Sequence, residues 1–302
     1  MAPRKRRGRS LVLGALVGGV GRLPSRPAAC LGRWLGDVGF LLLGGRRRAA
    51  LANLATAFPD LPEAERRRLC RRSFEHLGLM AVELCFALSR PLERVLERVR
   101  VEGLGHLRAA MERHGRVLVL TAHVGNWELL SVAHRLTGFP LTIVVRPLDA
   151  PALNALAERL RLKAGVELVA KRGALRAVLS ALDRGRMVGV LLDQNASRRE
   201  GVFVPFFGRP ASTSKGLALL AMRTRAPVVP IFAHREADGR HLVAIHPALE
   251  ASGTPERDRA IIDLTMRCNA AIEAAIRRTP EQWLWIHRRW RTRPPAERET
   301  PG

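Results

Sequence analysis

The stretch Val117 to His134, VLVLTAHVGNWELLSVAH, decides the fold and carries the strongest chemical motif of the chain. Four consecutive apolar residues, Val117 to Leu120, predict a short buried strand. The next six residues predict a turn, and an amphipathic helix is predicted from Trp127 onward. Because open α/β sheets place their ligands where strands end, this turn is the first candidate for a site.

Two titratable side chains of this stretch, His123 and Glu128, are predicted to form the catalytic pair. On one regular helix, five positions correspond to about 500°, so the two side chains would point roughly 140° apart. If His123 lies in the turn and Glu128 in the first helical turn, the turn can fold the imidazole over the carboxylate. We therefore expect His123 to act as a general base that Glu128 orients, and we consider backbone amides near Gly125 as oxyanion donors.

Outside this stretch, helical and strand patterns alternate along most of the chain. Such alternation is typical of a mixed, mostly parallel sheet flanked by helices, so the predicted fold class is α/β. The predicted strands are Val99–Val101, Val117–Leu120, Leu141–Val145, Val166–Val169, Met187–Leu192, Val228–Phe232 and His241–Ile245. The predicted helices lie within Arg46–Ser89 and over Leu104–Arg113, Ala152–Lys163, Ala174–Asp183 and Lys215–Arg223, with a last helix that ends near Arg278.

The N-terminal part predicts helices that contact a membrane. A basic run, Pro3 to Arg9, precedes the apolar run Leu11 to Gly21, and a second apolar stretch continues to Gly45. Neither run reaches the ~20 apolar residues that span a bilayer. We therefore expect an interfacial anchor, with a shallow core helix as the alternative. The predicted organisation is a basic N-terminus with membrane-associated helices (1–45), one main domain (46–291) and a disordered tail (292–302).

Polar residues also follow the predicted strand Met187–Leu192. Asp193 and Gln194 come directly after it, and a long loop then carries three phenylalanines and three arginines, among them Arg209. We expect this loop to reach a helix that Ser212 or Thr213 opens, and to hold an amphiphile. An ordinary connection with buried phenylalanines is the alternative.

Arg146 follows the strand Leu141–Val145 and is therefore expected at the same edge of the sheet. A guanidinium there is suited to binding phosphate or to pairing with Glu128. An ordinary surface arginine is the alternative, because 47 of the 51 basic residues are arginines.

Tryptophans and arginines are interleaved near the C-terminus, in PEQWLWIHRRWRTRP from Pro280 to Pro294. Indole rings beside arginines suit a membrane interface and also single-stranded nucleic acid, while a position half buried against the core is the alternative. His287 is a weaker candidate base than His123, because its basic neighbours disfavour an imidazolium.

Composition narrows the function classes. A net charge of +24 predicts attraction to polyanions such as nucleic acid, anionic lipid or an acidic protein. The four cysteines form no CxxC or Cys/His cluster, so we expect no structural zinc, no other metal and no disulfide framework. A nucleic-acid binder would leave the strand-end motif unexplained, and a metal or serine hydrolase would lack HExxH or GxSxG. A non-catalytic membrane scaffold remains as a further alternative.

Six segments in the same order resemble the bacterial lipid A late acyltransferases. They are Arg46–Pro59, HVGNWE at His123 to Glu128, DQN at Asp193 to Asn195, Gly201–Gly216, Ala226–Pro230 and Pro280–Trp290. The resemblance implies a glycerolipid-acyltransferase-like fold and a membrane-bound enzyme of lipopolysaccharide biosynthesis. Such an enzyme moves a fatty acyl chain from acyl carrier protein to a hydroxyl of a lipid A precursor.

The resemblance also implies roles for particular residues. The catalytic histidine and acid of the family match His123 and Glu128, and its substrate-binding positions match Arg146 and Asp193. We add Gln194 and Arg209 as further substrate contacts, and expect direct transfer without a cofactor, because no serine or cysteine adjoins His123. The implied partners are the acyl carrier protein donor, an anionic glycolipid acceptor and the inner membrane, with the site facing the cytoplasm or the membrane interface. An acceptor other than lipid A is the alternative within the family.

Overall fold

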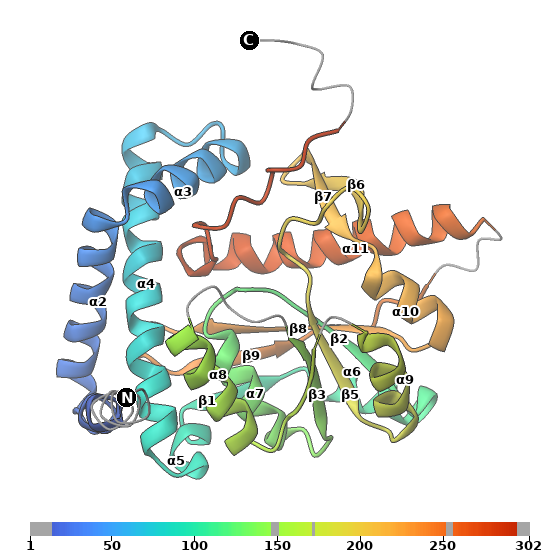
Figure 1. The fold of residues 1–302 in the computed structure, drawn as a ribbon, viewed down its shortest axis with the longest axis horizontal. Coiled ribbons are helices and arrows are strands. Elements are labelled where there is room, and N and C mark those ends of the chain that lie inside the picture. The colour runs from blue at the N-terminus through green and yellow to red at the C-terminus, as the bar shows by residue number, and fades with distance from the viewer. Residues whose placement is uncertain (1–13, 146–150, 171–172, 252–255, 295–302) are drawn as a thin grey trace, which may run out of the picture.

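The computed structural model describes residues 14–145, 151–170, 173–251 and 256–294 (Figure 1). Its centre is a seven-stranded sheet in the order β1-β9-β8-β2-β5-β3-β4. The strands are β1 (Val99–Glu102), β2 (Val117–Thr121), β3 (Leu141–Val145), β4 (Glu167–Ala170), β5 (Met187–Leu191), β8 (Val228–Arg235) and β9 (His241–Ile245). Neighbouring strands are parallel except β8 and β9. This confirms the predicted α/β class with a mixed, mostly parallel sheet.

Helices cover both faces of the sheet, because β2 is apolar on both sides. Leu118 and Leu120 belong to the core that includes α9 (Ala174–Asp183), α10 (Gly216–Thr224) and α11 (Arg257–Arg278). Val117 and Val119 belong to the core on the other face, with α5 (Leu92–Leu96), α6 (Leu104–His114), α7 (Trp127–Ala133) and α8 (Pro151–Lys163). A strand buried on both faces reads as a continuous apolar run, which is why this segment was recognisable.

Three helices stand on one flank of the sheet: α2 (Ser25–Leu42), α3 (Gly44–Ala57) and the long α4 (Glu63–Ser89) (Figure 1). Small residues let α2 approach α4 closely. A Cβ atom added at Gly36 would lie 2.3 Å from the Cα of Glu75, and one added at Gly78 would lie 2.0 Å from the carbonyl oxygen of Gly32. Large side chains at these positions would separate the two helices.

The helix pair leaves a row of apolar side chains uncovered. Trp34 is 60% exposed and Leu42 is 76% exposed. Leu35, Leu41 and Leu43 are exposed as well. Among the described residues, no helix combines the length and the apolar character that crossing a bilayer requires.

The segment after β5 differs from the prediction. Instead of a long loop, residues 201–214 form a β-hairpin of β6 (Gly201–Phe206) and β7 (Arg209–Ser214), and Ser212 and Thr213 lie in β7. The next helix, α10, begins at Gly216. Phe207 and Gly208 form the turn with φ of 50° and 71°, and positive φ at both central residues is typical of a two-residue hairpin turn.

The chain returns to the sheet after α11. The short helices η1 (His134–Leu136) and η2 (Pro280–Gln282) lie after α7 and α11. From η2, residues 283–294 run past α3 towards the β6–β7 hairpin (Figure 1). Arg289, which is fully buried, donates to the carbonyl oxygen of Ser212 and to the hydroxyl of Thr213. The predicted tail 292–302 lies outside the described residues from 295 onward.

Candidate active site

His123 and Asp193 meet at the carboxyl edge of the sheet. Thr121 ends β2 and Leu191 ends β5, and these two residues are paired in the parallel register. His123 and Asp193 each follow two residues later, so the same edge presents both side chains. Nδ1 of His123 lies 2.9 Å from Oδ1 of Asp193. The imidazole is 13% exposed and the carboxylate only 2% exposed.

The surroundings of Asp193 keep its carboxylate charged. Burial on its own would raise the pKa, but the nearby His123 ring and three N–H groups hold the pKa at about 2. Besides the ring, the main-chain N–H of His123 donates to Oδ2 over 3.1 Å and the indole N–H of Trp283 donates over 2.8 Å. An ionised acceptor at Nδ1 selects the tautomer with the proton on Nδ1. The second ring nitrogen, Nε2, has no hydrogen-bond partner among the described residues and is left to accept a proton.

Glu128 does not hold His123, and this corrects the predicted pairing. Its two carboxylate oxygens accept from Nε and Nη2 of Arg161 on α8, over 3.0 and 2.6 Å. Both side chains of this ion pair are largely buried. Glu128 lies in the first turn of α7, and α7 packs against α8, so the carboxylate turns towards the neighbouring helix. The carboxylate that contacts Nδ1 of His123 is that of Asp193.

Trp127 connects the two carboxylate sites. Its indole N–H donates to Oε1 of Glu128 over 3.1 Å. Its ring meets the His123 imidazole edge-on, with centroids 4.9 Å apart. Among the described residues, Glu128 is therefore linked to His123 through the indole ring of Trp127.

The turn that carries His123 is pinned by the C-terminal segment. The main-chain N–H of Leu284 donates to the carbonyl oxygen of His123, and Val124 forms a β-bridge with Trp283. Gly125 donates its own N–H to Gln282, so this amide is not available as the oxyanion donor considered from the sequence. A Cβ atom at Gly125, where φ is +58°, would lie 1.8 Å from the carbonyl oxygen of Ala233. Only glycine fits this close approach.

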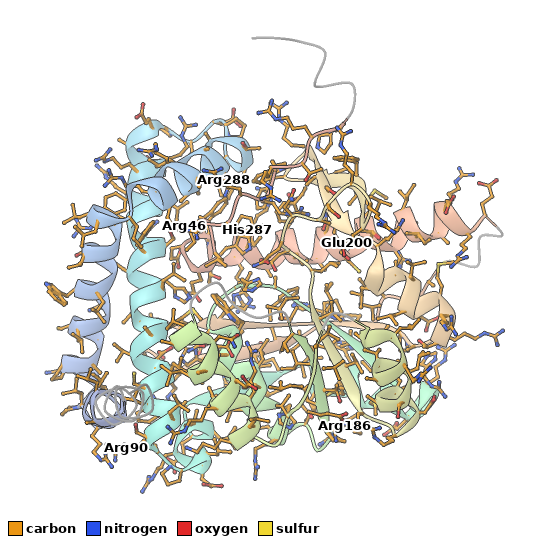
Figure 2. All side chains as sticks on the ribbon, in the orientation of Figure 1. Arg46, Arg90, Arg186, Glu200, His287 and Arg288 are labelled. Carbon is orange, nitrogen blue, oxygen red and sulfur yellow. The ribbon has the colours of Figure 1, made fainter. Side chains whose placement is uncertain are left out.

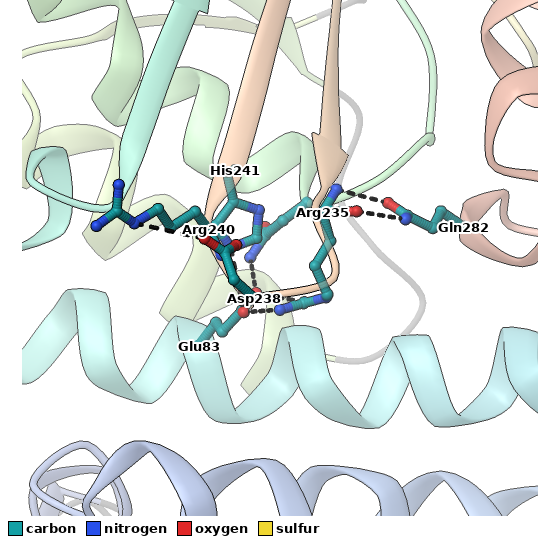
Figure 3. A network of polar contacts seen from close by, with 7 residues as sticks. Glu83, Arg235, Asp238, Arg240, His241 and Gln282 are labelled. Atoms are coloured by element: carbon teal, nitrogen blue, oxygen red, sulfur yellow. Dashed lines mark hydrogen bonds and ion pairs between the residues drawn. The ribbon is translucent and has the colours of Figure 1, made fainter.

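A buried ionic network supports the same turn from α4 (Figure 3). Glu83 accepts two hydrogen bonds from Arg235 and a third from His241. It also accepts from the side-chain amide of Asn126 over 2.6 Å. Burial would raise the pKa of Glu83, but the positive charges of His241 and Arg235 hold it well below its ordinary value. Gln282 exchanges two hydrogen bonds with the main chain of Arg235, which ties η2 to β8.

An apolar cleft of about 60 Å³ lies beside the site, between the sheet and α7. Its walls include Trp127, Glu128 and Arg161 at the polar end. The rest is lined mainly by aliphatic side chains of the sheet and of α7, with Thr121, Ser131, His134 and Thr137 as further polar residues. The cleft is therefore mainly apolar, with one ion pair in its wall.

The other predicted site residues lie in different surroundings. Gln194 is half-buried next to Asp193, whereas Arg209 is exposed at the turn of the β6–β7 hairpin. Arg146 lies outside the described residues. His287 accepts a hydrogen bond from the main-chain N–H of Asn195, and burial together with neighbouring arginines lowers its pKa to about 4. A neutral ring that serves as an acceptor is consistent with the expectation that His287 is a weaker candidate base than His123.

Sequence reasoning missed Arg161 and Trp283 as members of the site. The sequence predicts Arg161 only as part of a helix. For the tryptophans it leaves open a membrane interface, single-stranded nucleic acid or a position half buried against the core. The indole of Trp283 is fully buried, because its N–H must reach Asp193. The DQN motif and the WLW segment were both visible in the sequence, but nothing in one chain showed that they meet.

Comparisons with known proteins identify a family. Residues 5–292 match the family model of the bacterial lipid A biosynthesis acyltransferases. The chain is 31% identical to the lipid A biosynthesis palmitoleoyltransferase of Escherichia coli K12 over 276 residues, which cover 90% of this chain and 87% of that protein. It is 30% identical to the lipid A biosynthesis lauroyltransferase of the same organism, over 87% of this chain and 85% of that protein.

A solved structure is also similar in part. The 1-acyl-sn-glycerophosphate acyltransferase of Thermotoga maritima aligns with 79% of this chain and 97% of that chain, at 16% identity and a TM-score of 0.35. The family model and the two relatives each cover most of the sequence, and the residues that the family model matches include His123, Asp193 and Trp283. The chain therefore belongs to the bacterial lipid A biosynthesis acyltransferases.

Proposed function

We propose that this protein transfers a fatty acyl chain from acyl carrier protein to a hydroxyl of a lipid A precursor, with His123 as the general base. Family membership supports acyl transfer onto lipid A. The thioester donor and the role of the histidine are our additions. The observation that carries the role of the histidine is the hydrogen bond between His123 and the buried, ionised Asp193.

The proposed reaction is a direct transfer. Nε2 of His123 removes the proton from the acceptor hydroxyl as its oxygen attacks the thioester carbonyl carbon. The tetrahedral intermediate then expels the thiolate, which takes the proton from the imidazolium, so an ester and a free thiol are formed. A negative Asp193 beside Nδ1 stabilises the imidazolium while it exists.

Glu128 has a supporting role in this proposal. Its ion pair with Arg161 fixes α7 against α8, and its hydrogen bond to Trp127 sets the ring that packs on His123. It therefore acts on the position of the base. We place Gln194 at the edge where the substrates enter, since it follows a strand that ends there. Arg146 stays a predicted substrate contact.

The surroundings suit lipid substrates. We propose that the apolar cleft receives the first part of the acyl chain. The exposed apolar row on α2 would then rest on the inner membrane, with the active site facing the cytoplasm or the interface. A net charge of +24 attracts both an acidic carrier protein and anionic lipid.

The test is acyl transfer by purified full-length protein, with acyl carrier protein thioester and a lipid A precursor in mixed micelles. General-base catalysis contributes roughly 10² to 10⁴ in rate, so His123→Ala should lose turnover by that factor while it keeps acceptor binding. His106→Ala is the matched control, because His106 is an exposed histidine on α6. Wild-type turnover by His123→Ala would refute the proposed base.

A further inference from the structure

A second pocket, of about 380 Å³, lies between α3 and the C-terminal segment. Four arginines line it: Arg48 on α3, and Arg288, Arg291 and Arg293 on the C-terminal segment. We call it the arginine pocket. Figure 2 shows Arg288 on the segment that passes α3, with His287 beside it. The facing side of α3 is hollow because Gly45, Ala49 and Ala52 are small.

The charges of the arginine pocket are not neutralised by the protein. No acidic residue lines the pocket. Among the described residues, none of its four guanidinium groups forms an ion pair, whereas Arg71 pairs with Asp37 and Arg161 with Glu128. Trp290 also lines the pocket, and its buried indole N–H has no acceptor in the described part of the chain. Donors without acceptors gathered in one hollow are suited to an anion.

The backbone that presents these arginines is held firmly. Asn53, which is buried on α3, donates to the carbonyl oxygens of Trp285 and His287 over 2.7 and 2.6 Å. Asn195 exchanges hydrogen bonds with Thr292, and each is 3.0 Å long. Asn195 lies two residues after Asp193, so the same contacts that fix the pocket join it to the candidate active site. A preorganised cluster loses little freedom when it binds its ligand.

Apolar surface adjoins the arginine pocket on one side. Leu41 and Leu42 at the end of α2 and the following Leu43 are all exposed, and Leu43 is two residues before Gly45 of the pocket wall. An anion that binds here therefore has hydrocarbon surface next to it. This combination fits an amphiphile with a phosphate group better than it fits a soluble anion.

We propose that the arginine pocket binds a phosphate group of the glycolipid acceptor and thereby sets which hydroxyl reaches His123. This rests on the proposed function, because it names the part of the acceptor that the site recognises. Planar guanidinium groups bind phosphate oxygens in pairs, and the doubly charged group would match the free charges of the pocket. The pocket would act on acceptor binding and leave the chemical step unchanged.

The test compares two acceptors with two triple variants of the full chain. Arg48→Gln/Arg288→Gln/Arg291→Gln removes three pocket charges. Arg108→Gln/Arg176→Gln/Arg223→Gln removes three exposed arginines on α6, α9 and α10 that form no ion pair in the described part of the chain. The acceptors are a phosphorylated lipid A precursor and the same lipid without phosphate, in identical neutral micelles.

With the phosphorylated acceptor, the pocket variant should raise the KM for acceptor at least tenfold, since charged hydrogen bonds are each worth roughly that factor. Its kcat and its KM for the donor should change less than threefold. With the dephosphorylated acceptor, the two triple variants should behave alike. An equal loss with both acceptors, or a rise in the donor KM alone, would overturn the assignment.

Equilibrium titration separates this proposal from the proposed function. His123→Ala protein should bind the phosphorylated lipid more tightly than the dephosphorylated one, and the pocket substitutions in that background should abolish the difference. Such binding without any acyl transfer by the wild type would disprove the proposed reaction and leave the pocket standing. Inorganic phosphate that bound as tightly as the lipid would identify a free anion as the ligand and refute our proposal.

Discussion

Glu128 and Asp193 are two buried carboxylates near one imidazole, and they have different partners. Glu128 is five residues from His123 and pairs with an arginine on α8. Asp193 is seventy residues away and receives the ring Nδ1 of His123. The difference shows that a residue at the end of a strand meets the residues at the end of the paired strand, and not those nearest to it in sequence. The two residues that follow Thr121 and Leu191 meet because those strands are paired.

The two carboxylates also differ in the kind of cation they face. Asp193 faces a ring that can gain and lose a proton, whereas Glu128 faces a guanidinium that stays charged. A carboxylate beside a titrating group can assist a reaction, and one beside a permanent cation holds structure. Variants of the two residues should therefore fail in different ways.

The largest effect is expected for Asp193→Asn. The amide can donate to Nδ1, which would move the ring proton to Nε2 and leave no base for the acceptor hydroxyl. We expect a loss in kcat of roughly 10³-fold with little change in the acceptor KM, on the scale of other histidine–carboxylate pairs. Steady-state kinetics and circular dichroism check this on purified protein. Turnover within threefold of wild type would remove Asp193 from the mechanism.

A smaller loss of activity and a larger loss of stability are expected for Glu128→Gln. Breaking one partner of a buried ion pair costs about 3 kcal/mol, because Arg161 keeps an uncompensated charge. The double variant Glu128→Gln/Arg161→Gln should recover part of the free energy of unfolding and part of the activity. Denaturant titration and acyl transfer measure the two quantities. A stable double variant as inactive as Asp193→Asn would show that Glu128 takes part in the chemistry.

The smallest expected effect is on the pH dependence of stability, to which His76 and Asp193 contribute in different pH ranges. Burial lowers the pKa of His76, which lies against Gly125 of the motif turn, from 6.5 to about 4. Between these two values the unfolded chain binds a proton at His76 and the folded protein does not. The free energy of unfolding should therefore fall as the pH drops from about 6.5 to 4. Asp193 has a pKa lowered from 3.8 to about 2, so its contribution is complete above about pH 4 and is lost towards pH 2.

His76→Gln should therefore flatten the stability profile between pH 6.5 and 4 by about 2 kcal/mol, and Asp193→Asn should change its slope only below pH 4. Urea titrations at half-unit steps of pH measure both slopes. An unchanged slope in His76→Gln would mean that other buried histidines, such as His234 and His287, carry the acid sensitivity.

Local patterns were enough to predict most of the sheet. Leu141–Val145 and His241–Ile245 were predicted with the bounds of β3 and β9, because apolar runs between polar turns define buried strands. The β6–β7 hairpin was missed because its turn is Phe207–Gly208, and a bulky residue with positive φ is not the usual sequence signal for such a turn.

The site was predicted in part. His123 and Asp193 were both recognised as strand-end residues, but the acid that holds the base was chosen by its distance along the chain. The pairing of Thr121 with Leu191 and the burial of Trp283 against Asp193 are long-range contacts, which one sequence does not reveal. Arg161 had no signal beyond its place on a helix.

The bridge between the motif turn and residues 282–284 has a consequence for synthesis. Every strand of the sheet leaves the ribosome before Gln282 does. The sheet can therefore form while the turn around His123 still lacks its backbone partners. In a nascent chain at that stage, His123 and Gly125 lack their hydrogen bonds to Leu284 and Gln282. We therefore expect the turn around His123 to reach its final position only after residues 282–284 have been synthesised.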